Sequence, residues 1–471
     1  MDRHIIISLK SGMSLLLLLG LSLPLSVMAQ RVAYPGGKTY MLRVELTDKK
    51  GSAYSLKHPE KFLSEKALKR RERQGLMVDS TDLPLSVRYV KAVSETGVTI
   101  VGQSKWNNTL LVSTPQADVA EQLRTLPCVR KVTQVLVTPD SIYPPKRWEY
   151  DKNPAQTDTL HVNHYGPALK QIETLGGVAL HEAGYRGQGI TVAILDGGFM
   201  NADSIPLFRH THIVGTKNFA HPLNNEVCSE LDHGTMVLSC MGANLPDIFV
   251  GTAPEANYWL IRTESGYFEQ ACEEDFWAMG AEFADSVGVD MINSSLGYNV
   301  FDEDMNSHQY RELDGHTALI SRTASMLAHK GIILVNSAGN EGNGTWKKIG
   351  FPADADNILT AGALRPTLVN APFSSIGPSA DNRMKPDVMA IGNPSAVING
   401  RGAITEASGT SFAAPVTCGM VASLWSALPH LTAYEMMDLV RRSADRYDHP
   451  DNVFGYGIPN YWKAYQSVKG E

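Results

Sequence analysis

Three apolar segments in the second half of the chain each have one polar residue at an end. Residues 191–195 are almost wholly apolar without alternation, which predicts a strand buried on both faces, and Asp196 ends this strand. His233 precedes a run of small and apolar residues that favours a buried helix. Ser411 precedes a third run, residues 413–424, whose small apolar side chains are typical of a central helix. The pattern predicts an α/β domain with polar residues at the carboxyl edge of a parallel sheet.

Shorter elements precede this domain, and their order predicts a small α+β unit. Strands are predicted at residues 40–46, 98–102, 110–114 and 129–137, and helices at residues 59–74, 87–93 and 117–126. The basic run at residues 66–73 is interpreted as a solvent-exposed helix face rather than a nucleic-acid site, because the net charge of the chain is −7. A linker rich in proline and polar residues follows, up to about residue 160.

The amino terminus has the pattern of an export signal. Two basic residues precede an apolar run that is short for a membrane span and ends in small residues before Gln30. We predict a signal peptide over residues 1–29 and a secreted or periplasmic protein without a membrane anchor once the signal is removed. An uncleaved membrane anchor is the alternative. The predicted domains are therefore residues 1–29, 30–160 and 161–471.

The three polar residues together supply what a serine hydroxyl needs to act as a nucleophile. An imidazole must take the proton, and a carboxylate must hold that imidazole in the useful tautomer. Taken singly, Asp196 could be a turn residue and Ser411 a helix N-cap. Their order in the chain, Asp then His then Ser, excludes a serine esterase of another fold, which expects Gly-x-Ser-x-Gly with the serine first.

Because of the three segments around Asp196, His233 and Ser411, the chain resembles the subtilisin family (subtilases) of serine proteases. The resemblance extends from about residue 165 to about residue 465. Four further segments match in order: residues 293–297, 332–342, 350–363 and 373–388. The resemblance implies a subtilisin-like α/β fold, a parallel sheet flanked by helices. It also implies that residues 30–160 are a small α+β prodomain that assists folding and inhibits the enzyme, the alternative being an unrelated N-terminal module.

The resemblance implies a role for each catalytic residue. Ser411 would attack the scissile carbonyl, His233 would accept and return the proton, and Asp196 would orient the imidazole. Asn340 would donate its side-chain amide to the oxyanion, beside the backbone N–H of Ser411 at a helix start. Without the resemblance, the sequence favours Asn340 as a turn residue near Gly339 and Gly342 over an oxyanion donor.

The substrate-binding residues are also implied by the resemblance. We expect the substrate to bind as an added strand. The residues expected to bind it and to form the specificity pocket are Ser295, Leu296, Gly297, Ala338, Gly339 and Gly350. An uncrowded, uncharged pocket predicts Phe, Tyr, Leu or Met before the cleaved bond. The alternative is that these glycines serve tight turns only.

Three departures from the family pattern affect the expected tuning of the catalytic residues and the expectation of a bound calcium ion. Gly197 follows Asp196 where many relatives have a hydroxyl residue, and Met236 stands where the family often has a second His. Residues 244–251 replace a loop that binds structural calcium in many relatives, and Asp247 is their only carboxylate. A structural calcium is left open, and no other metal or cofactor is predicted, because no metal-ligand motif is present.

Five cysteines make a disulfide framework unexpected, although a bridge between Cys228 and Cys272 is left open. The function predicted is a secreted serine endopeptidase made as a zymogen, a monomer acting on proteins or peptides, with its own pro-region as inhibitor. Its processing site is expected in the linker, with Tyr150 as the candidate. A catalytically silent, subtilase-like binding protein is the alternative, and a missing catalytic residue would be its sign.

Overall fold

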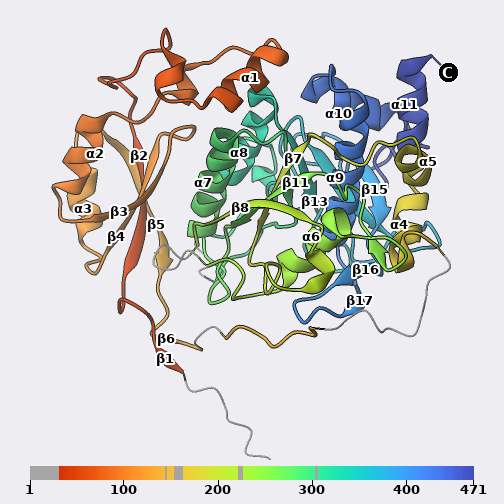
Figure 1. Cartoon of the computed structure of the whole chain (residues 1–471). Helices are drawn as coiled ribbons and strands as arrows, with labels where there is room; N and C mark the ends of the chain where they lie inside the picture. Colours follow the sequence, from red (N-terminus) through yellow and green to blue (C-terminus); the bar gives the residue numbers. More distant parts are fainter. Residues whose placement is uncertain (1–30, 144–145, 153–162, 221–225, 303–305, 471) are drawn as a thin grey trace, which may run out of the picture.

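The computed structural model describes residues 31–143, 146–152, 163–220, 226–302 and 306–470. The predicted signal peptide and part of the linker lie outside these residues. Two units stand side by side, an N-terminal one built around an antiparallel sheet and a larger one built around a parallel sheet (Figure 1).

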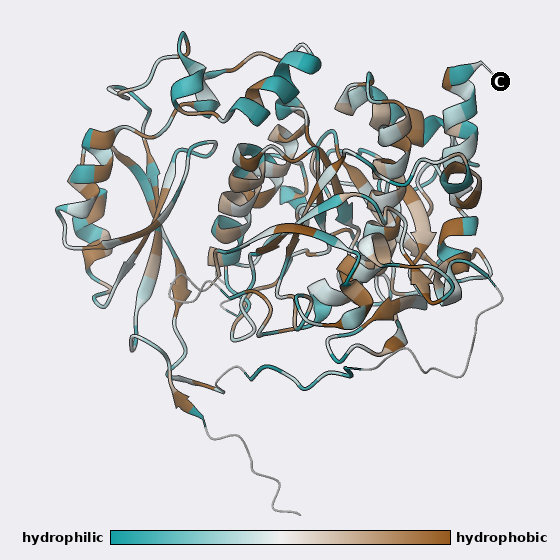
Figure 2. Ribbon diagram, in the orientation of Figure 1, coloured by the Kyte–Doolittle hydropathy of each residue, from teal (hydrophilic) through white to brown (hydrophobic). Residues whose placement is uncertain are grey.

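The larger unit has a parallel sheet at its centre. Within the described residues it has seven strands in the order β15-β14-β13-β12-β7-β11-β8. The strands are β7 (Thr191–Asp196), β8 (His212–Asn218), β11 (Asn257–Arg262), β12 (Met291–Ser294), β13 (Ile333–Ser337), β14 (Leu359–Leu364) and β15 (Val388–Ile391). The central strands are hydrophobic along their length (Figure 2), as expected for a sheet covered on both faces.

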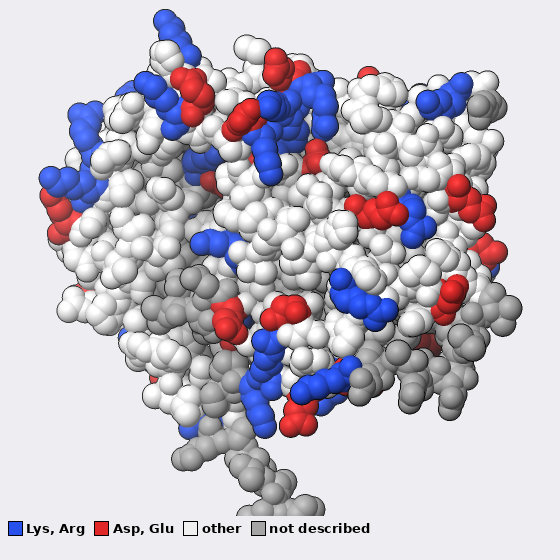
Figure 3. Space-filling model, viewed as in Figure 1, with Lys and Arg blue, Asp and Glu red and all other residues white. Residues whose placement is uncertain are grey.

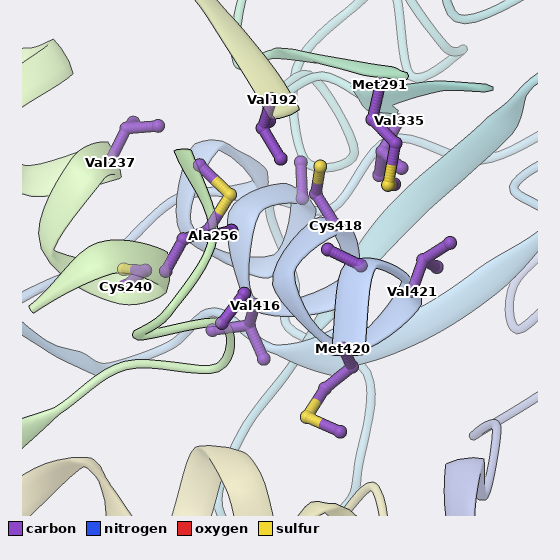
Figure 4. Close-up of a cluster of buried hydrophobic side chains, with 14 of the residues drawn as sticks. Val192, Val237, Cys240, Ala256, Met291, Val335, Val416, Cys418, Met420 and Val421 are labelled. Carbon is purple, nitrogen blue, oxygen red and sulfur yellow. The ribbon is translucent and has the colours of Figure 1, made fainter. Parts of the chain in front are cut away.

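Alternation along β7 shows how the two faces are covered. Val192 and Ile194 belong to a core with α6 (His233–Gly242) and α9 (Thr410–Ala427), whereas Ala193 and Leu195 pack against α7 (Cys272–Val287) and α8 (Leu319–Met326). Figure 4 shows Cys418 of α9 pointing toward Val192 of β7 and Met291 of β12, whereas Met420 points to the other side of the helix. The helix that begins at Ser411 is therefore central, as predicted.

Smaller elements complete this unit. Helices α4 (Leu169–Glu173), α5 (Gly177–Glu182), α10 (Ala433–Arg442) and α11 (Tyr461–Lys469) lie around α9, and the hairpins are β9 (Asn244–Leu245) with β10 (Phe249–Val250) and β16 (Ser395–Ile398) with β17 (Ile404–Ala407). No helix in the described part of the chain is both long and apolar enough to cross a bilayer.

The N-terminal unit is the small α+β domain that the sequence predicts. Its sheet has the order β3-β4-β2-β5, from β2 (Tyr40–Leu46), β3 (Thr99–Ser104), β4 (Thr109–Thr114) and β5 (Val129–Val137); β1 (Val32–Ala33) pairs with β6 (Ser141–Ile142). One face of the sheet forms a core with α2 (Val87–Ser94) and α3 (Val119–Arg124). The other face joins the core around α7 through Met41, Leu111 and Val135. The two units thus share a hydrophobic interface.

The single helix predicted over residues 59–74 is wrong. A short 3₁₀ turn (Pro59–Lys61) is followed by α1 (Glu65–Arg73), and the Ser64 hydroxyl accepts a hydrogen bond from the Ala67 N–H (3.1 Å). Ser64 therefore caps α1 and sets its start.

The interpretation of the basic run as a solvent-exposed face is wrong for two of its arginines. Figure 3 shows Lys and Arg side chains gathered over α1, yet Arg70 and Arg71 are only 4% and 1% exposed. Both pair with Asp285 of α7, and Arg71 also pairs with Asp82 (3.0 Å). Sequence periodicity could not predict the burial of Arg70 and Arg71, because the carboxylate of Asp285 that pairs with both belongs to the other unit.

Further acidic residues of α7 hold the N-terminal unit. The guanidinium of Arg43 on β2 donates to the Asp275 carboxylate at 2.6–2.9 Å. Glu282 accepts from the backbone N–H groups of Lys105 and Trp106, both at 3.0 Å. The interface is therefore bonded by polar groups around its apolar centre.

All five cysteines are free and buried. The bridge left open between Cys228 and Cys272 is not formed. Cys228 packs in the core on the α9 side of the sheet, and Cys272 packs in the core on the α7 side. Burial raises the pKa of Cys228 and of Cys240 to about 12, so neither is a reactive thiolate at neutral pH.

Candidate active site

The carboxyl end of β7 meets the start of α6. Asp196 is the last residue of β7 and is fully buried, and His233 is the first residue of α6. The Nδ1 atom of His233 lies 2.9 Å and 3.0 Å from the two carboxylate oxygens of Asp196. The backbone N–H of Gly197 also donates to the Asp196 carboxylate (2.8 Å). A backbone donor thus braces the carboxylate at the position where the hydroxyl of many relatives is missing.

A glycine lets α6 begin this close to the end of β7. The Gly234 N–H donates to the Gly198 carbonyl (2.9 Å). A Cβ at residue 234 would lie 2.5 Å from that carbonyl oxygen, which is closer than real Cβ contacts. Gly234 therefore allows the contact that sets His233 beside Asp196.

Ser411 lies in the first turn of α9. Its hydroxyl donates to the carbonyl of Ser295 (3.2 Å), and the Ser295 hydroxyl donates to the carbonyl of Ser411 (2.8 Å). The next side chain, Phe412, packs beside the imidazole of His233, with ring centroids 5.8 Å apart. The first turn of α9 is thus held between Ser295, which follows β12, and α6.

Asn340 follows β13 and is anchored to the start of α9. Its Oδ1 accepts from the Thr410 N–H (2.9 Å) and from the Thr410 hydroxyl (3.1 Å). Since Oδ1 is engaged, Nδ2 is the atom left to donate into the cleft, where the side chain is exposed. Gly339 has φ +106°, a conformation that favours glycine. The glycine therefore permits the turn that brings Asn340 to the start of α9.

These residues surround a cleft of about 370 Å³. Of the residues predicted from the sequence, those that line it are Asp196, His233, Ser295, Leu296, Gly297, Gly339, Asn340, Gly350 and Ser411. Ala338 does not line it. It is fully buried, and its N–H and carbonyl bond to Ala361 and Gly350.

Sequence reasoning missed an acidic wall of the cleft. Glu264 and Glu269 line it, and the Tyr298 hydroxyl donates to Glu264 (2.9 Å). Glu264 comes two residues after β11, whose last residue pairs in parallel with Asp196. The rule that parallel strands end at one edge of a sheet would have placed Glu264 beside the catalytic candidates.

The charges of the cleft shift one another's proton affinities. Burial lowers the pKa of His233, but the charge and hydrogen bond of Asp196, aided by Glu264 and Asp232, outweigh burial and raise the pKa to about 9. Burial, with the charges of Glu269 and Asp196, raises the pKa of Glu264 well above its usual range. Burial and the charge of Asp302 raise the pKa of Glu269 to about 7. Crowding and loss of water therefore make these two carboxyl groups keep their protons to a higher pH than free carboxyl groups do.

The residues in the place of the calcium loop do not supply a calcium site by themselves. They form the β9–β10 hairpin, with Asp247 at its turn as the one carboxylate, whereas calcium takes about six to eight oxygens. Among the described residues no three His, Cys, Asp or Glu side chains are grouped so that they could hold a metal.

The cleft is open to solvent and is lined by a serine hydroxyl, an imidazole and a carboxylate, which are the groups that hydrolyse amides by nucleophilic attack. By class the molecule is a serine endopeptidase.

The chain belongs to the subtilase family, whose model matches residues 187–457. A second model, the peptidase S8 propeptide domain of Bacteroidota, matches residues 41–147, so the N-terminal unit is a propeptide domain. Subtilisin NAT of Bacillus subtilis subsp. natto is 28% identical over 321 residues, covering 66% of this chain and 75% of that protein. Serine protease AprX of B. subtilis is 27% identical over 319 residues, covering 60% of this chain and 67% of AprX.

A solved structure shares the fold. The epidermin leader peptide processing serine protease (EpiP) of Staphylococcus aureus superposes with a TM-score of 0.63 at 15% identity, over 92% of this chain and 99% of that one. The likeness therefore includes both the N-terminal unit and the peptidase unit.

Proposed function

We propose that the enzyme cleaves peptide bonds with Ser411 as nucleophile, His233 as general base and acid, and Asp196 as the orienting carboxylate. The observation that carries this proposal is the contact of His233 Nδ1 with both oxygens of Asp196 at 2.9 Å and 3.0 Å. Nδ1–H donates to the carboxylate, which makes Nε2 the atom that takes the proton from Ser411.

The reaction then has two halves. Ser411 Oγ attacks the scissile carbonyl while His233 Nε2 takes its proton, and the negative oxygen that forms accepts hydrogen bonds from Asn340 Nδ2 and the Ser411 N–H. His233 returns the proton to the leaving amine, and an acyl enzyme is left. Water repeats the sequence and releases the second product. Loss of one oxyanion donor of this kind costs about 10²- to 10³-fold in turnover.

For specificity, we propose a large apolar side chain before the cleaved bond. Gly297, Gly339 and Gly350 line the cleft, and a Cβ at Gly297 would meet only one atom within 4 Å, at 3.6 Å. The space beside Gly297 therefore supports a bulky substrate group. The substrate backbone would add as a strand along residues 295–297, which favours unfolded or loop-exposed proteins.

We further propose export and a zymogen state. Export is supported by the sequence of residues 1–29, which lie outside the described part of the chain, and the proposed enzyme is a secreted or periplasmic monomer. Inhibition by the pro-region is supported by the shared hydrophobic interface and by the ion pairs of α7 with Arg43, Arg70 and Arg71.

The test is self-processing of the chain that lacks residues 1–29. Intact mass is followed at neutral pH for this chain and for its Ser411→Ala twin. We expect only the wild type to lose a fragment that ends between residues 139 and 160, because the twin lacks the nucleophile. If both chains stay whole, and the wild type also ignores unfolded protein and a fluorophosphonate probe, the silent binding protein replaces this proposal.

The pH dependence of the mature enzyme gives a second test. His233 acts as a base only in its neutral form, and its pKa is raised to about 9 by Asp196 and its acidic neighbours against the effect of burial. We therefore expect kcat/KM for an uncharged peptide to increase with pH up to about 9, because the imidazole is protonated and inactive as a base at lower pH. A pH–rate profile measures this. An acid limb near the ordinary histidine value of about 6.5 would contradict it.

A further inference from the structure

An extended substrate presents successive side chains to opposite walls of the cleft. If the side chain before the cleaved bond enters the space beside Gly297 and Gly350, the preceding side chain points toward the other wall. We place Leu231 and Glu264 on that side, because both line the cleft and both lie beside Gly197, which follows Asp196. A Cβ on Gly197 would lie 3.4 Å from Glu264 Oε2, so this carboxylate lies against the backbone that follows Asp196.

Glu264 lies at this wall without a cation of its own. Its Oε1 accepts from the Tyr298 hydroxyl (2.9 Å), and no Lys or Arg among the described residues pairs with its carboxylate or with that of Glu269. Arg262, two residues earlier, pairs with Glu230 (2.6 Å) and donates only to the backbone carbonyl of Glu264 (3.1 Å). The half-buried side chain of Glu264 and the side chain of Glu269 both line the open cleft, so a cation that enters from solvent can reach both.

We infer that Glu264 is a specificity-determining residue that selects Lys or Arg at the substrate position immediately before the residue whose bond is cut. This inference rests on the proposed function and adds a second requirement to it. The favoured sequence is a basic residue followed by a large apolar one. A carboxylate that is partly withdrawn from water and faces an incoming cation makes a charge-assisted hydrogen bond.

The experiment uses the self-processed enzyme and three fluorogenic peptides with Phe before the cleaved bond and Arg, Met or Glu at the preceding position. We expect kcat/KM for the Arg peptide to exceed that for the Met peptide by about 10-fold or more, with the Glu peptide slowest. In Glu264→Gln, which keeps an acceptor for Tyr298, the ratio of Arg to Met should fall to about 1.

A matched control and a pH series separate charge recognition from a structural role. Glu341→Gln removes another carboxylate that lines the cleft, next to Asn340, and should keep the Arg to Met ratio. The groups that act on Glu264 include Glu269, Asp196, Tyr298, His233 and, from α7, Glu273, and burial favours its protonated form. The wild-type ratio should therefore grow between about pH 6 and pH 9, and the Glu264→Gln ratio should stay constant.

Each result decides a separate question. Rapid cleavage of all three peptides without an Arg preference, or an Arg preference kept by Glu264→Gln, overturns the inference and leaves the proposed function standing. Failure to cleave any peptide overturns the inference together with the proposed preference for a large apolar residue, because all three peptides carry Phe before the cleaved bond, whereas the self-processing that yields the enzyme tests the nucleophile separately. Self-processing after Tyr150 would also count against the inference, because Glu149 would then face Glu264.

Discussion

Replacement of His233 by alanine is expected to lower kcat for peptide hydrolysis by about 10⁶-fold. The Ser411 hydroxyl remains in this variant, but no other group is placed to take its proton, because Asp196 contacts the imidazole rather than the serine. Steady-state kinetics with a fluorogenic peptide measures the loss. Both proteins are matured through a cleavage site for an unrelated protease, placed within residues 153–162, so that failed self-processing does not obscure the result.

The control for this experiment is His212→Ala, which removes an exposed histidine on β8. It should keep nearly full activity and full labelling by a fluorophosphonate, whereas His233→Ala should lose both. If His233→Ala kept more than about a hundredth of the wild-type kcat, His233 would not be the general base.

Replacement of Asp285 by alanine is expected to weaken binding of the processed pro-region by about 10³-fold. Asp285 is fully buried and is the shared partner of Arg70 and Arg71, so the variant leaves two arginines buried against α7 with reduced compensation. Inhibition of peptide hydrolysis across a dilution series of the processed complex measures the affinity. Weaker inhibition by the variant's own pro-region is the expected result.

Asp290→Ala provides the matched comparison. Asp290 also pairs with an arginine of α1, Arg73, at 3.1 Å, but the Arg73 side chain is 41% exposed. An exposed pair contributes about 0–1 kcal/mol, so this variant should change the affinity less than about 5-fold. If the two variants weakened pro-region binding equally, the burial of Asp285 would not explain its contribution to the affinity.

The sequence predicted the peptidase fold where one rule governs the local pattern. Residues 191–195 are read as a strand buried on both faces because such strands need no alternation, and β7 spans Thr191–Asp196. The run that begins at Ser411 contains residues too small and apolar for a surface helix, and α9 is buried along almost its whole length. In both cases the apolar pattern of a single buried segment was sufficient to predict its secondary structure.

Prediction failed where the partner of a residue lies far away in the chain. Arg70 and Arg71 are bonded to Asp285, more than 200 residues later, so their charge pattern alone indicated solvent. Glu264 was missed for a related reason, because its importance comes from facing Asp196 and His233 across the sheet edge. Ala338 was assigned to the cleft by resemblance, although its side chain points into the core.

The acidic side of α7 has a consequence for the life of the enzyme after maturation. Asp275, Glu282 and Asp285 each draw their bonding partners from the propeptide domain: Arg43, then Ser104 to Trp106, then Arg70 and Arg71. If the proposed self-processing removes that domain, one helix keeps three carboxylates that have lost these bonding partners. Their mutual repulsion is then felt in the folded state more than in an unfolded chain, where they are far apart in water. The propeptide domain thus pairs with the acidic side of α7 in the unprocessed chain, and an enzyme that had lost this domain would keep a folded state whose formation the domain could no longer assist.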